Sequence, residues 1–394
     1  MTLSPTGLSV ARSLAPRGVA VYGVDCLRSE IGHYSRWVRH HARISYLRPG
    51  GRLLDGLVSF GRKQDLPPVI FLAGDPYMDF VARNHVLLRE YFILPDSMRP
   101  EVCSVFLNKS TFYKRCSELG VAMPATFFPR SEREASDAAG QIGYPAIVKP
   151  AFGHLYRRRL RGRKLIEVHS PEELLQWWRR FEAWGADSVL QEVVVGPETN
   201  IHVAALYTDA RLRCRSVFTA RKSRQYPPWY GSGSYMEASW SEEIARLSMD
   251  LVRRLGYRGI CGTEFKWDTR DGAWKLIEIN PRPTLWFALT RAAGVDVVWD
   301  AYCDLVQAPN PVHVNCQNDT RRWQLLARDV VSGLYFLRRG DLGFGEFLRT
   351  VVSPARKQFA VLSRDDPRTI AAYPLYNLSK YLATRFNGSS PHVI

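Results

Sequence analysis

The chain has 394 residues, enough for two or three domains, and its 46% hydrophobic and 23% charged residues are typical of a soluble globular protein. Seven scattered cysteines without a C-x-x-C pair argue against a disulfide framework or a zinc site, and neither a signal peptide nor an apolar run of about 18 residues is visible. We therefore expect a cytoplasmic protein, whose net charge of +16 would attract nucleic acid, anionic lipid headgroups or phosphorylated substrates.

The first predicted elements are a helix from Thr6 and a buried strand over residues 19–24. Only five residues precede Thr6, so the strand that would open a βαβ unit is missing from the sequence. Either the true start of the protein lies upstream, or a neighbouring element covers the exposed edge. No G-x-G-x-x-G motif precedes the helix, which argues against a dinucleotide-binding fold.

A second strand is predicted over residues 69–73, followed by a helix over 76–91. With the first strand it would form a small parallel α/β domain over residues 1–105. Asp75 and Asp79 follow the carboxyl end of this strand, where open α/β sheets bind ligands. A helix cap is an equally good explanation for Asp75.

A different region, residues 106–309, begins with an amphipathic helix from Lys109. A strand over 125–128 and a helix over 131–142 follow, and Lys149 then ends a buried apolar strand. Lysines are almost never fully buried unless they are paired. We therefore expect an anion close to Lys149.

The loop after Lys149 is strongly basic and contains Gly153 and Gly162. Glycines around a run of cations favour a mobile flap over phosphates, whereas an exposed basic hairpin or a nucleic-acid patch are the alternatives. The cations of the loop are Arg157, Arg158, Arg159, Arg161, Arg163 and Lys164.

An extended segment with Gln191, Glu192 and Val194 leads through a Gly-Pro turn to Glu198. Backbone N–H and C=O groups of an extended strand can bind the edge of adenine, and a carboxylate just beyond can accept two ribose hydroxyls. Alone this signal is weak. Further along, two more cations, Arg221 and Lys222, precede a loop rich in Pro, Gly and Ser. A helix is predicted over residues 241–255.

A β-hairpin around Asp271-Gly272 follows, and its register decides where Glu264 points. A two-residue loop would place Glu264 opposite Ile279 and so on the apolar face. A three-residue loop or a bulge would place it opposite Glu278 or Asn280, and since the hydrophobic pattern normally fixes register we expect this second arrangement. Oxygen ligands on rigid strands suit Mg²⁺, whereas a solvated hairpin face with salt bridges is the alternative.

The last region, residues 310–394, alternates basic and aromatic helical segments with turns. We expect these helices to pack back onto the preceding domain. Peripheral attachment to an anionic membrane, on the inner face of the cell membrane, is the alternative.

Several of these motifs, in this order, resemble the ATP-grasp superfamily. They are Asn108-Lys109, I-V-K-P at Lys149, the basic flap, Q-E-V-V with Glu198, and T-E-F followed by I-E-I-N-P-R. The likeness is strongest to the carboxylate–amine ligase branch, which includes D-aspartate ligase and the large chain of carbamoyl-phosphate synthase.

The resemblance implies an α/β (α+β) fold with three parts. These are an N-terminal pre-ATP-grasp parallel α/β domain without its first strand, over residues 1–105, an ATP-grasp domain with a central and an ATP-lid part, over 106–309, and a helical C-terminal extension, over 310–394. The implied activity joins a carboxylate, activated by ATP as an acyl phosphate, to an amine or amino acid.

The resemblance also implies residue roles. Lys109 and Lys149 would neutralise the phosphates of ATP. Arg282, together with Arg221 and Lys222, would bind the acyl phosphate or the substrate carboxylate. These cations, with Lys149, are the candidate catalytic residues.

The remaining implied roles concern the nucleoside and the metal. Adenine would meet Gln191 and the backbone of Glu192 and Val194, and Glu198 would hold the ribose. Two Mg²⁺ ions, with Mn²⁺ as the alternative, would be bound by Glu264, Glu278 and Asn280.

The expected partners are a small carboxylate and an amine, with an anionic or phosphorylated cell-surface precursor as one candidate acceptor and a homodimer as a candidate assembly. An ATP-binding protein without catalysis is the first alternative function. A basic nucleic-acid-binding protein is the second and weaker one, since the aromatic residues form no clear stacking platform.

Overall fold

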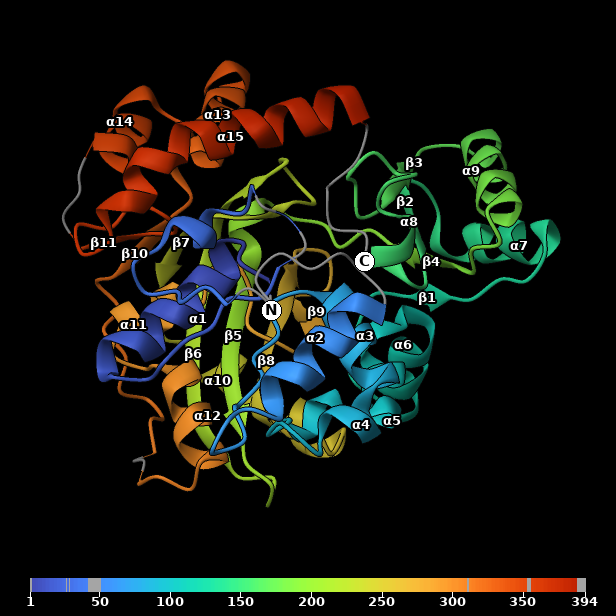
Figure 1. Cartoon of the computed structure of the whole chain (residues 1–394). Coiled ribbons are helices and arrows are strands. Elements are labelled where there is room, and N and C mark those ends of the chain that lie inside the picture. The colour runs from blue at the N-terminus through green and yellow to red at the C-terminus, as the bar shows by residue number, and fades with distance from the viewer. Residues whose placement is uncertain are drawn as a thin grey trace.

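The structure is a computed structural model and describes residues 2–25, 27, 29–41, 51–309, 312–352 and 356–387. Its strands form two sheets, one of four and one of seven strands. The smaller sheet and its helices project from one side as a lobe, which we call the lid, and helices cover the larger sheet (Figure 1). This mixed arrangement agrees with the expected α/β fold.

The N-terminal region is mostly helical. Its first helix, α1 (Pro5–Leu14), begins with a proline, whose missing N–H group costs nothing at that position. The other elements are η1 (Ala15–Arg17), η2 (Ile31–Tyr34), α2 (Gly51–Gly61), α3 (Asp75–Arg83), α4 (His85–Leu88), η3 (Asp96–Met98) and α5 (Pro100–Leu107).

The two strands expected in this region are reduced to single bridges, so the expectation of a parallel sheet is wrong in its extent. Tyr22 bridges Arg39, and Val69 bridges Ile93, both in parallel direction. Among the described residues before α1 there is no strand either. Both expected segments still direct apolar side chains toward a core, which explains why their sequence resembles that of strands.

The lid contains four short antiparallel strands in the order β1-β4-β2-β3. Ser131 and Ser170 cap its two long helices by accepting hydrogen bonds from backbone N–H groups. The elements are β1 (Thr126–Phe127), α7 (Glu132–Ile142), β2 (Ala146–Pro150), α8 (Gly153–Tyr156), β3 (Ile166–Val168), α9 (Pro171–Ala183) and β4 (Ser188–Glu192).

The larger sheet has the order β11-β10-β7-β6-β5-β8-β9 and is antiparallel except for the β10–β11 pair. A short turn, η4 (Glu198–Asn200), leads from the lid into it. Its strands are β5 (Ile201–Thr208), β6 (Cys214–Tyr226), β7 (Ser232–Ala238), β8 (Gly259–Asp268), β9 (Ala273–Asn280), β10 (Arg322–Gln324) and β11 (Lys357–Phe359).

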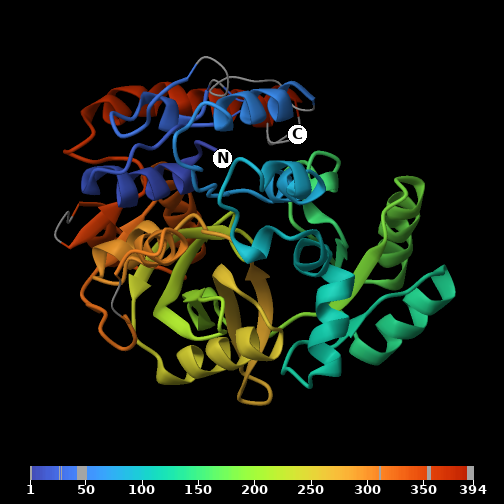
Figure 2. The same ribbon diagram turned by 60° about the horizontal axis from the view of Figure 1, so that its bottom comes forward.

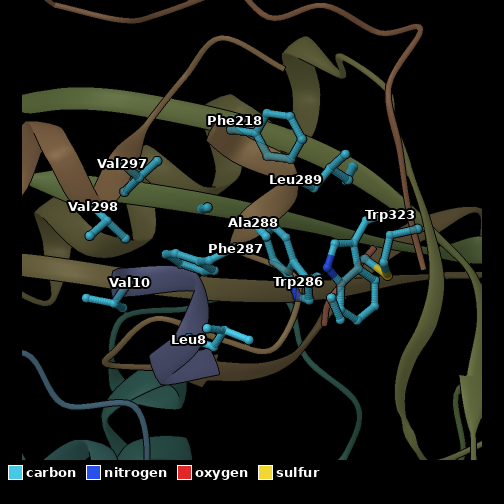
Figure 3. Packing of buried hydrophobic residues seen from close by; sticks show 14 of the residues in the cluster. Leu8, Val10, Phe218, Trp286, Phe287, Ala288, Leu289, Val297, Val298 and Trp323 are labelled. Atoms are coloured by element: carbon cyan, nitrogen blue, oxygen red, sulfur yellow. The ribbon is translucent and has the colours of Figure 1, made fainter. Parts of the chain in front are cut away.

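Two hydrophobic cores lie on opposite faces of this sheet. One contains residues of α1, α11 (Ala288–Ala292) and α12 (Val297–Leu305), where Leu8, Phe287 and Val298 pack near Phe218 of β6 (Figure 3). The other contains residues of α5, α6 (Lys109–Glu118) and α10 (Glu242–Arg254). The sheet is therefore held from both sides, which keeps the ends of its strands in fixed positions.

The β8–β9 hairpin has the expected register. Glu264 lies opposite Glu278, and Phe265 lies opposite Leu276, so that a bulge leaves Ile277 as the extra residue on β9. The expectation that a three-residue loop or a bulge places Glu264 opposite Glu278 or Asn280 is confirmed, through a bulge and with Glu278 as the partner. The same bulge turns Leu276 into the core with Ile279, whereas strict alternation had placed Leu276 beside Glu278.

The C-terminal region is helical, as expected, and also supplies two strands to the large sheet. Its helices are α13 (Leu326–Arg339), α14 (Phe344–Val352) and α15 (Pro367–Asn387). They lie together at one end of the molecule (Figures 1 and 2), where α15 packs against η2 of the N-terminal region. In the part of the chain that the structure describes, no helix combines the length and hydrophobicity needed to cross a membrane.

Candidate functional site

The centre of the candidate site is the pair of carboxylates on the β8–β9 hairpin. Lys222 of β6 lies 2.7 Å from Glu264, and Lys164 of the flap lies 3.8 Å from Glu278. Burial opposes ionisation of Glu278, yet the nearby ammonium groups, chiefly that of Lys164, lower its pKa to about 2. The Glu278 side chain is 27% exposed, so solvent screens part of this field. Glu278 is therefore negative at neutral pH and open to a cationic ligand.

Lys149 is placed as expected, at the end of a buried strand and close to these carboxylates. It is only 5% exposed and donates hydrogen bonds to Tyr113 (2.8 Å) and Gln191 (2.7 Å). Burial, and after it the positive charge of Lys109, lowers the pKa of Lys149 to about 7. A partner that is negatively charged would restore the ammonium form.

Tyr113 is a residue that the sequence interpretation missed. Its hydroxyl accepts the hydrogen bond from Lys149 and donates one to the carbonyl oxygen of Ile277, the extra residue of the bulge, at 2.5 Å. Tyr113 lies one helical turn after Lys109 on α6, so the i, i+4 spacing was the available signal that both face the site.

Lys109 itself opens α6, whose N-cap is Asn108. A Cβ atom placed on Gly153 would lie 3.4 Å from the Lys109 ammonium nitrogen, so the beginning of the flap passes close to that group. The absence of a side chain at Gly153 permits this approach. Lys109, Lys149 and Lys164 thus come from three different elements and surround Glu278.

Arg282 points toward the N-terminal region. Its guanidinium lies 2.5 Å from Asp75 of α3 and 3.5 Å from the side-chain oxygen of Asn280. Burial opposes the ionisation of Asp75, but Arg282 outweighs it and holds the pKa of that carboxyl well below its usual range. Asp75 was recognised in the sequence as either a ligand residue or a cap, and the structure shows it as the ion-pair partner of Arg282.

The basic flap divides into residues that face the site and residues that do not. Lys164 pairs with Glu278, and Arg157 is half-buried, with Asp75 and Glu278 as the negative charges that act on it most strongly. Arg159 instead lies over the Trp184 ring, 5.6 Å from its centre. The expectation of six cations over one site is therefore met by two of them, because the remaining four, Arg158, Arg159, Arg161 and Arg163, are exposed on the outer side.

The segment expected to meet adenine lies where the lid joins the large sheet. Gln191 is buried and donates a hydrogen bond to Thr126 at 2.8 Å. The Glu192 side chain turns to the hairpin end, where it lies 2.5 Å from Arg270. The Val194 carbonyl accepts a hydrogen bond from Lys266 at 2.8 Å. The backbone N–H group of Glu192 also has a partner, because it donates a hydrogen bond to the carbonyl oxygen of Ala125 at 2.9 Å.

Glu198 is buried and enclosed by backbone. It accepts hydrogen bonds from the N–H groups of Gln225, at 3.2 Å, and of Trp229. Burial raises the pKa of Glu198 despite these donors. Gln225 in turn accepts a hydrogen bond from Lys222 at 3.2 Å, so a continuous polar chain connects Glu198 with Glu264.

Lys266 is a second residue that the sequence interpretation missed. Burial lowers the pKa of Lys266, and its nearest negative charges include Glu198 and Glu264. Lys266 stands two residues after Glu264 on β8, so the two side chains point to the same face of the strand. This spacing was the available signal.

Arg221 does not join the cluster. It pairs with Glu237 of β7 at 2.5 Å, on the opposite face of β6 from Lys222. Since successive residues of a strand point to opposite faces, Arg221 and Lys222 cannot both reach Glu264. The expectation that both would bind the same substrate group is therefore wrong for Arg221.

The proposed metal ligands fit a hard cation in chemistry. Two carboxylates and an amide oxygen, from Glu264, Glu278 and Asn280, are the donors that Mg²⁺ prefers when phosphate oxygens complete its coordination. In the described parts of the chain no three His, Cys, Asp or Glu side chains form a group able to hold a metal by themselves. Metal binding by Glu264, Glu278 and Asn280 would thus depend on a ligand that supplies phosphate oxygens.

Residues 234–302, which include the hairpin, match the family of the carbamoyl-phosphate synthase L chain, ATP-binding domain. The D-aspartate ligase of Enterococcus faecium is 26% identical over 224 residues, which cover 54% of this chain and 53% of that protein. The chain therefore spans about half the length of this curated relative.

Two solved structures are similar over more of the chain. An N5-carboxyaminoimidazole ribonucleotide synthetase in complex with ADP has a TM-score of 0.63 and 13% identity, and the match covers 96% of this chain and 95% of that one. The biotin carboxylase domain of 2-oxoglutarate carboxylase from Hydrogenobacter thermophilus, a dimer in complex with MgADP, has a TM-score of 0.59 and 16% identity, over 81% and 71% of the two chains. At these identities the likeness concerns the fold.

Proposed function

The chain belongs to the ATP-grasp superfamily, and from this premise we propose that it is an ATP- and Mg²⁺-dependent ligase that joins a carboxylate to an amine. The carboxylate would attack the γ-phosphate of ATP, giving an acyl phosphate and ADP. The amine would then displace phosphate and form the C–N bond. Such a reaction depends on positioning and on neutralisation of charge, and it needs no nucleophilic side chain.

The observation that carries this proposal is the cluster around Glu278. Three lysines from three elements, Lys109, Lys149 and Lys164, surround the ionised Glu278, which lies opposite Glu264 on the adjacent strand. The hydrogen-bond acceptors of the Lys149 ammonium group are a hydroxyl and an amide, not a carboxylate. A polyphosphate bound between these lysines would compensate their charge.

In this proposal the chain's own residues have distinct tasks. Lys109 and Lys149 hold the phosphates, Glu198 holds the ribose, and Arg282 orients the carboxylate or the acyl phosphate. Lys222 keeps Glu264 in place. The backbone of Glu192 and Val194, with Gln191, would contact adenine.

Glu264, Glu278 and Asn280 would bind Mg²⁺, as two ions, or Mn²⁺ in its place. The bound metal would neutralise negative charge on the transferring phosphoryl group. The hairpin contributes rigidity, because the three donors stand on paired strands whose register is fixed by the bulge.

The substrates proposed are a small carboxylate and an amine, and an anionic or phosphorylated precursor as acceptor agrees with the net charge of +16. The same charge favours a place in the cytoplasm with peripheral contact to an anionic membrane face. A homodimer is a compatible assembly. An ATP-binding protein without catalysis is the second candidate.

ADP release by the full chain with MgATP tests the ligase proposal. Release should require both a carboxylate and an amine from a panel of amino acids and small carboxylates. Glu278→Ala should lower the rate at least about a hundredfold, because it removes a group that acts on the transferring phosphate. Glu182→Ala, an exposed change on α9, should stay within about twofold.

Unchanged ADP release by a folded Glu278→Ala variant would contradict the ligase proposal. Saturable ATP binding by the wild-type protein, without ADP from any substrate mixture, would instead support the non-catalytic candidate.

A further inference from the structure

The C-terminal helix α15 is apolar on two opposite faces. Its inner face buries Thr369, Ala372, Tyr373 and Tyr376 against the core and η2. An ordinary surface helix has charged or polar residues on the other side. Here the outer face carries large apolar side chains with exposed fractions of 42% to 68%, namely Ile370, Leu375, Leu378 and Leu382.

The neighbouring helix α14 repeats this pattern. Phe344, Leu348 and Val352 follow each other at four-residue spacing, so they lie on one face, and they are 69%, 47% and 65% exposed. Both helices lie at the same end of the molecule (Figures 1 and 2). More than half of the exposed large apolar residues among those that the structure describes fall between Val331 and Leu382. Such a concentration is typical of a surface that meets an apolar partner.

The polar surroundings of these helices are strongly basic. Within residues 331–382 three acidic residues are exposed, Asp341, Glu346 and Asp365, and one of them pairs with Arg339. The exposed arginines of the same stretch are twice as many: Arg338, Arg339, Arg349, Arg356, Arg364 and Arg368. None of these arginines takes part in the candidate site.

We propose that the outer faces of α14 and α15 dock onto an anionic phospholipid bilayer. Apolar side chains would enter the boundary between headgroups and acyl chains, while the arginines would remain among the lipid phosphates. The charge decides between occupants. A second copy of this chain would bring like-charged surfaces together at a net charge of +16 each, whereas an anionic membrane neutralises that charge.

This docking is independent of the ligase proposal, because none of its residues touches the carboxylates or lysines of the site. It would place the protein on the membrane as an in-plane attachment, not as a spanning one. A protein held in this way meets substrates that are themselves attached to lipid.

The test is co-sedimentation of the full chain with vesicles of phosphatidylglycerol and phosphatidylcholine, compared with vesicles of phosphatidylcholine alone. We expect binding to the anionic vesicles, weakened by added salt because the arginines act through screened charge. The double change Leu375→Ser with Leu378→Ser should lower partitioning about tenfold to a hundredfold. The double change Val86→Ser with Leu87→Ser, at exposed apolar positions of α4, should leave it within about twofold.

A second variant probes the charge separately. Arg364→Gln with Arg368→Gln should weaken binding to anionic vesicles at low salt and leave thermal unfolding unchanged, since both side chains are exposed. Equal partitioning to neutral and anionic vesicles would overturn the proposal, as would unchanged binding of the Leu375→Ser, Leu378→Ser variant. A wild-type dimer that dissociates in that variant would assign the face to a second copy and would also overturn it.

Discussion

At the scale of one residue, the charge of the Lys149 side chain depends both on its burial and on the charge of a bound ligand. In the free protein its ammonium is removed from water and faces Lys109 and Lys164, and its pKa falls to about 7. A lysine with a pKa of about 7 is only partly charged at neutral pH, and a negative ligand would make it fully charged. At this position the phosphates of ATP would supply that charge, so binding and protonation should be coupled.

ATP binding at pH 8 is predicted to be accompanied by proton uptake. The free Lys149 is mostly neutral above its pKa of about 7, and nearby phosphates favour the ammonium form, so its pKa rises and a proton enters from the buffer. Calorimetric binding enthalpies should therefore depend on the ionisation enthalpy of the buffer. The variant Lys149→Met should bind MgATP more weakly and lose this dependence. Net proton release by the wild-type protein would contradict the assignment.

Single residues of the site were predictable where chemistry and periodicity agreed. A buried lysine needs an anion, and two carboxylates on one strand face need a cation, which led to Lys149, Glu264 and Glu278. Arg221, which the family resemblance also implied, faces the other side of β6 and pairs with Glu237. The role of Tyr113 depends on a contact 164 residues away, which no local pattern contains.

At the scale of an element, the flap shows that only some cations of a basic segment face the candidate site. The short helix α8 and the turn after it direct Arg157 and Lys164 inward, and they leave Arg158 on the outer surface. Which arginine points inward depends on the helical phase of a four-residue turn. The sequence predicted a basic flap but could not predict this division.

Arg157→Ala is predicted to raise the KM for ATP about tenfold to a hundredfold, because a charged side chain that faces the phosphates would be lost. Arg158→Ala removes the same charge from the outside of the flap and should change KM less than about twofold. Steady-state ADP release against ATP concentration measures both. Equal effects of the two changes would mean that the flap acts by net charge alone.

The hairpin register was the most informative prediction at this scale. The polar face of β9 excluded a register that buries Glu264, and the structure has Glu264 opposite Glu278. The position of the bulge was beyond the sequence. Its extra residue, Ile277, offers its carbonyl to Tyr113, so the tertiary contact and not the local pattern stabilises the bulge there.

At the scale of the whole molecule, the two ends of the chain hold each other. Arg12 of α1 pairs with Asp366, just before α15, at 2.9 Å, and both side chains are buried. Asp366 also accepts hydrogen bonds from the Ser35 hydroxyl and the Arg36 backbone N–H group. The C-terminal region thus packs back onto the N-terminal region, as expected from sequence, while α15 keeps a second face exposed.

Asp366→Ala is predicted to destabilise the native state by about 3–5 kcal/mol, because it leaves the buried Arg12 without its counter-charge. The adjacent Asp365 is exposed, and Asp365→Ala should change the free energy of unfolding by no more than about 0.5 kcal/mol. Urea denaturation of the two variants beside the wild type gives both values. A similar loss in both would argue against the buried pair as the cause.

The C-terminal strands β10 and β11 were not predicted, since each has three residues and little sequence signal. Their place in the sheet follows from partners that lie far back in the chain, with Trp323 opposite Met236. The two N-terminal strands were predicted but form only single bridges. Their segments are apolar enough to resemble strands, yet apolar segments can pack their side chains without pairing their backbones. Long-range pairing is what a single sequence reveals least.

The ion pair between Arg12 and Asp366 joins residues 354 positions apart, and this distance matters during synthesis on the ribosome. The helix that carries Arg12 cannot complete this ion pair until the residues up to Asp366 have been translated. In the meantime its apolar side would be open to water, and to other nascent chains. We therefore expect chaperones to bind α1 while the rest of the chain is being translated.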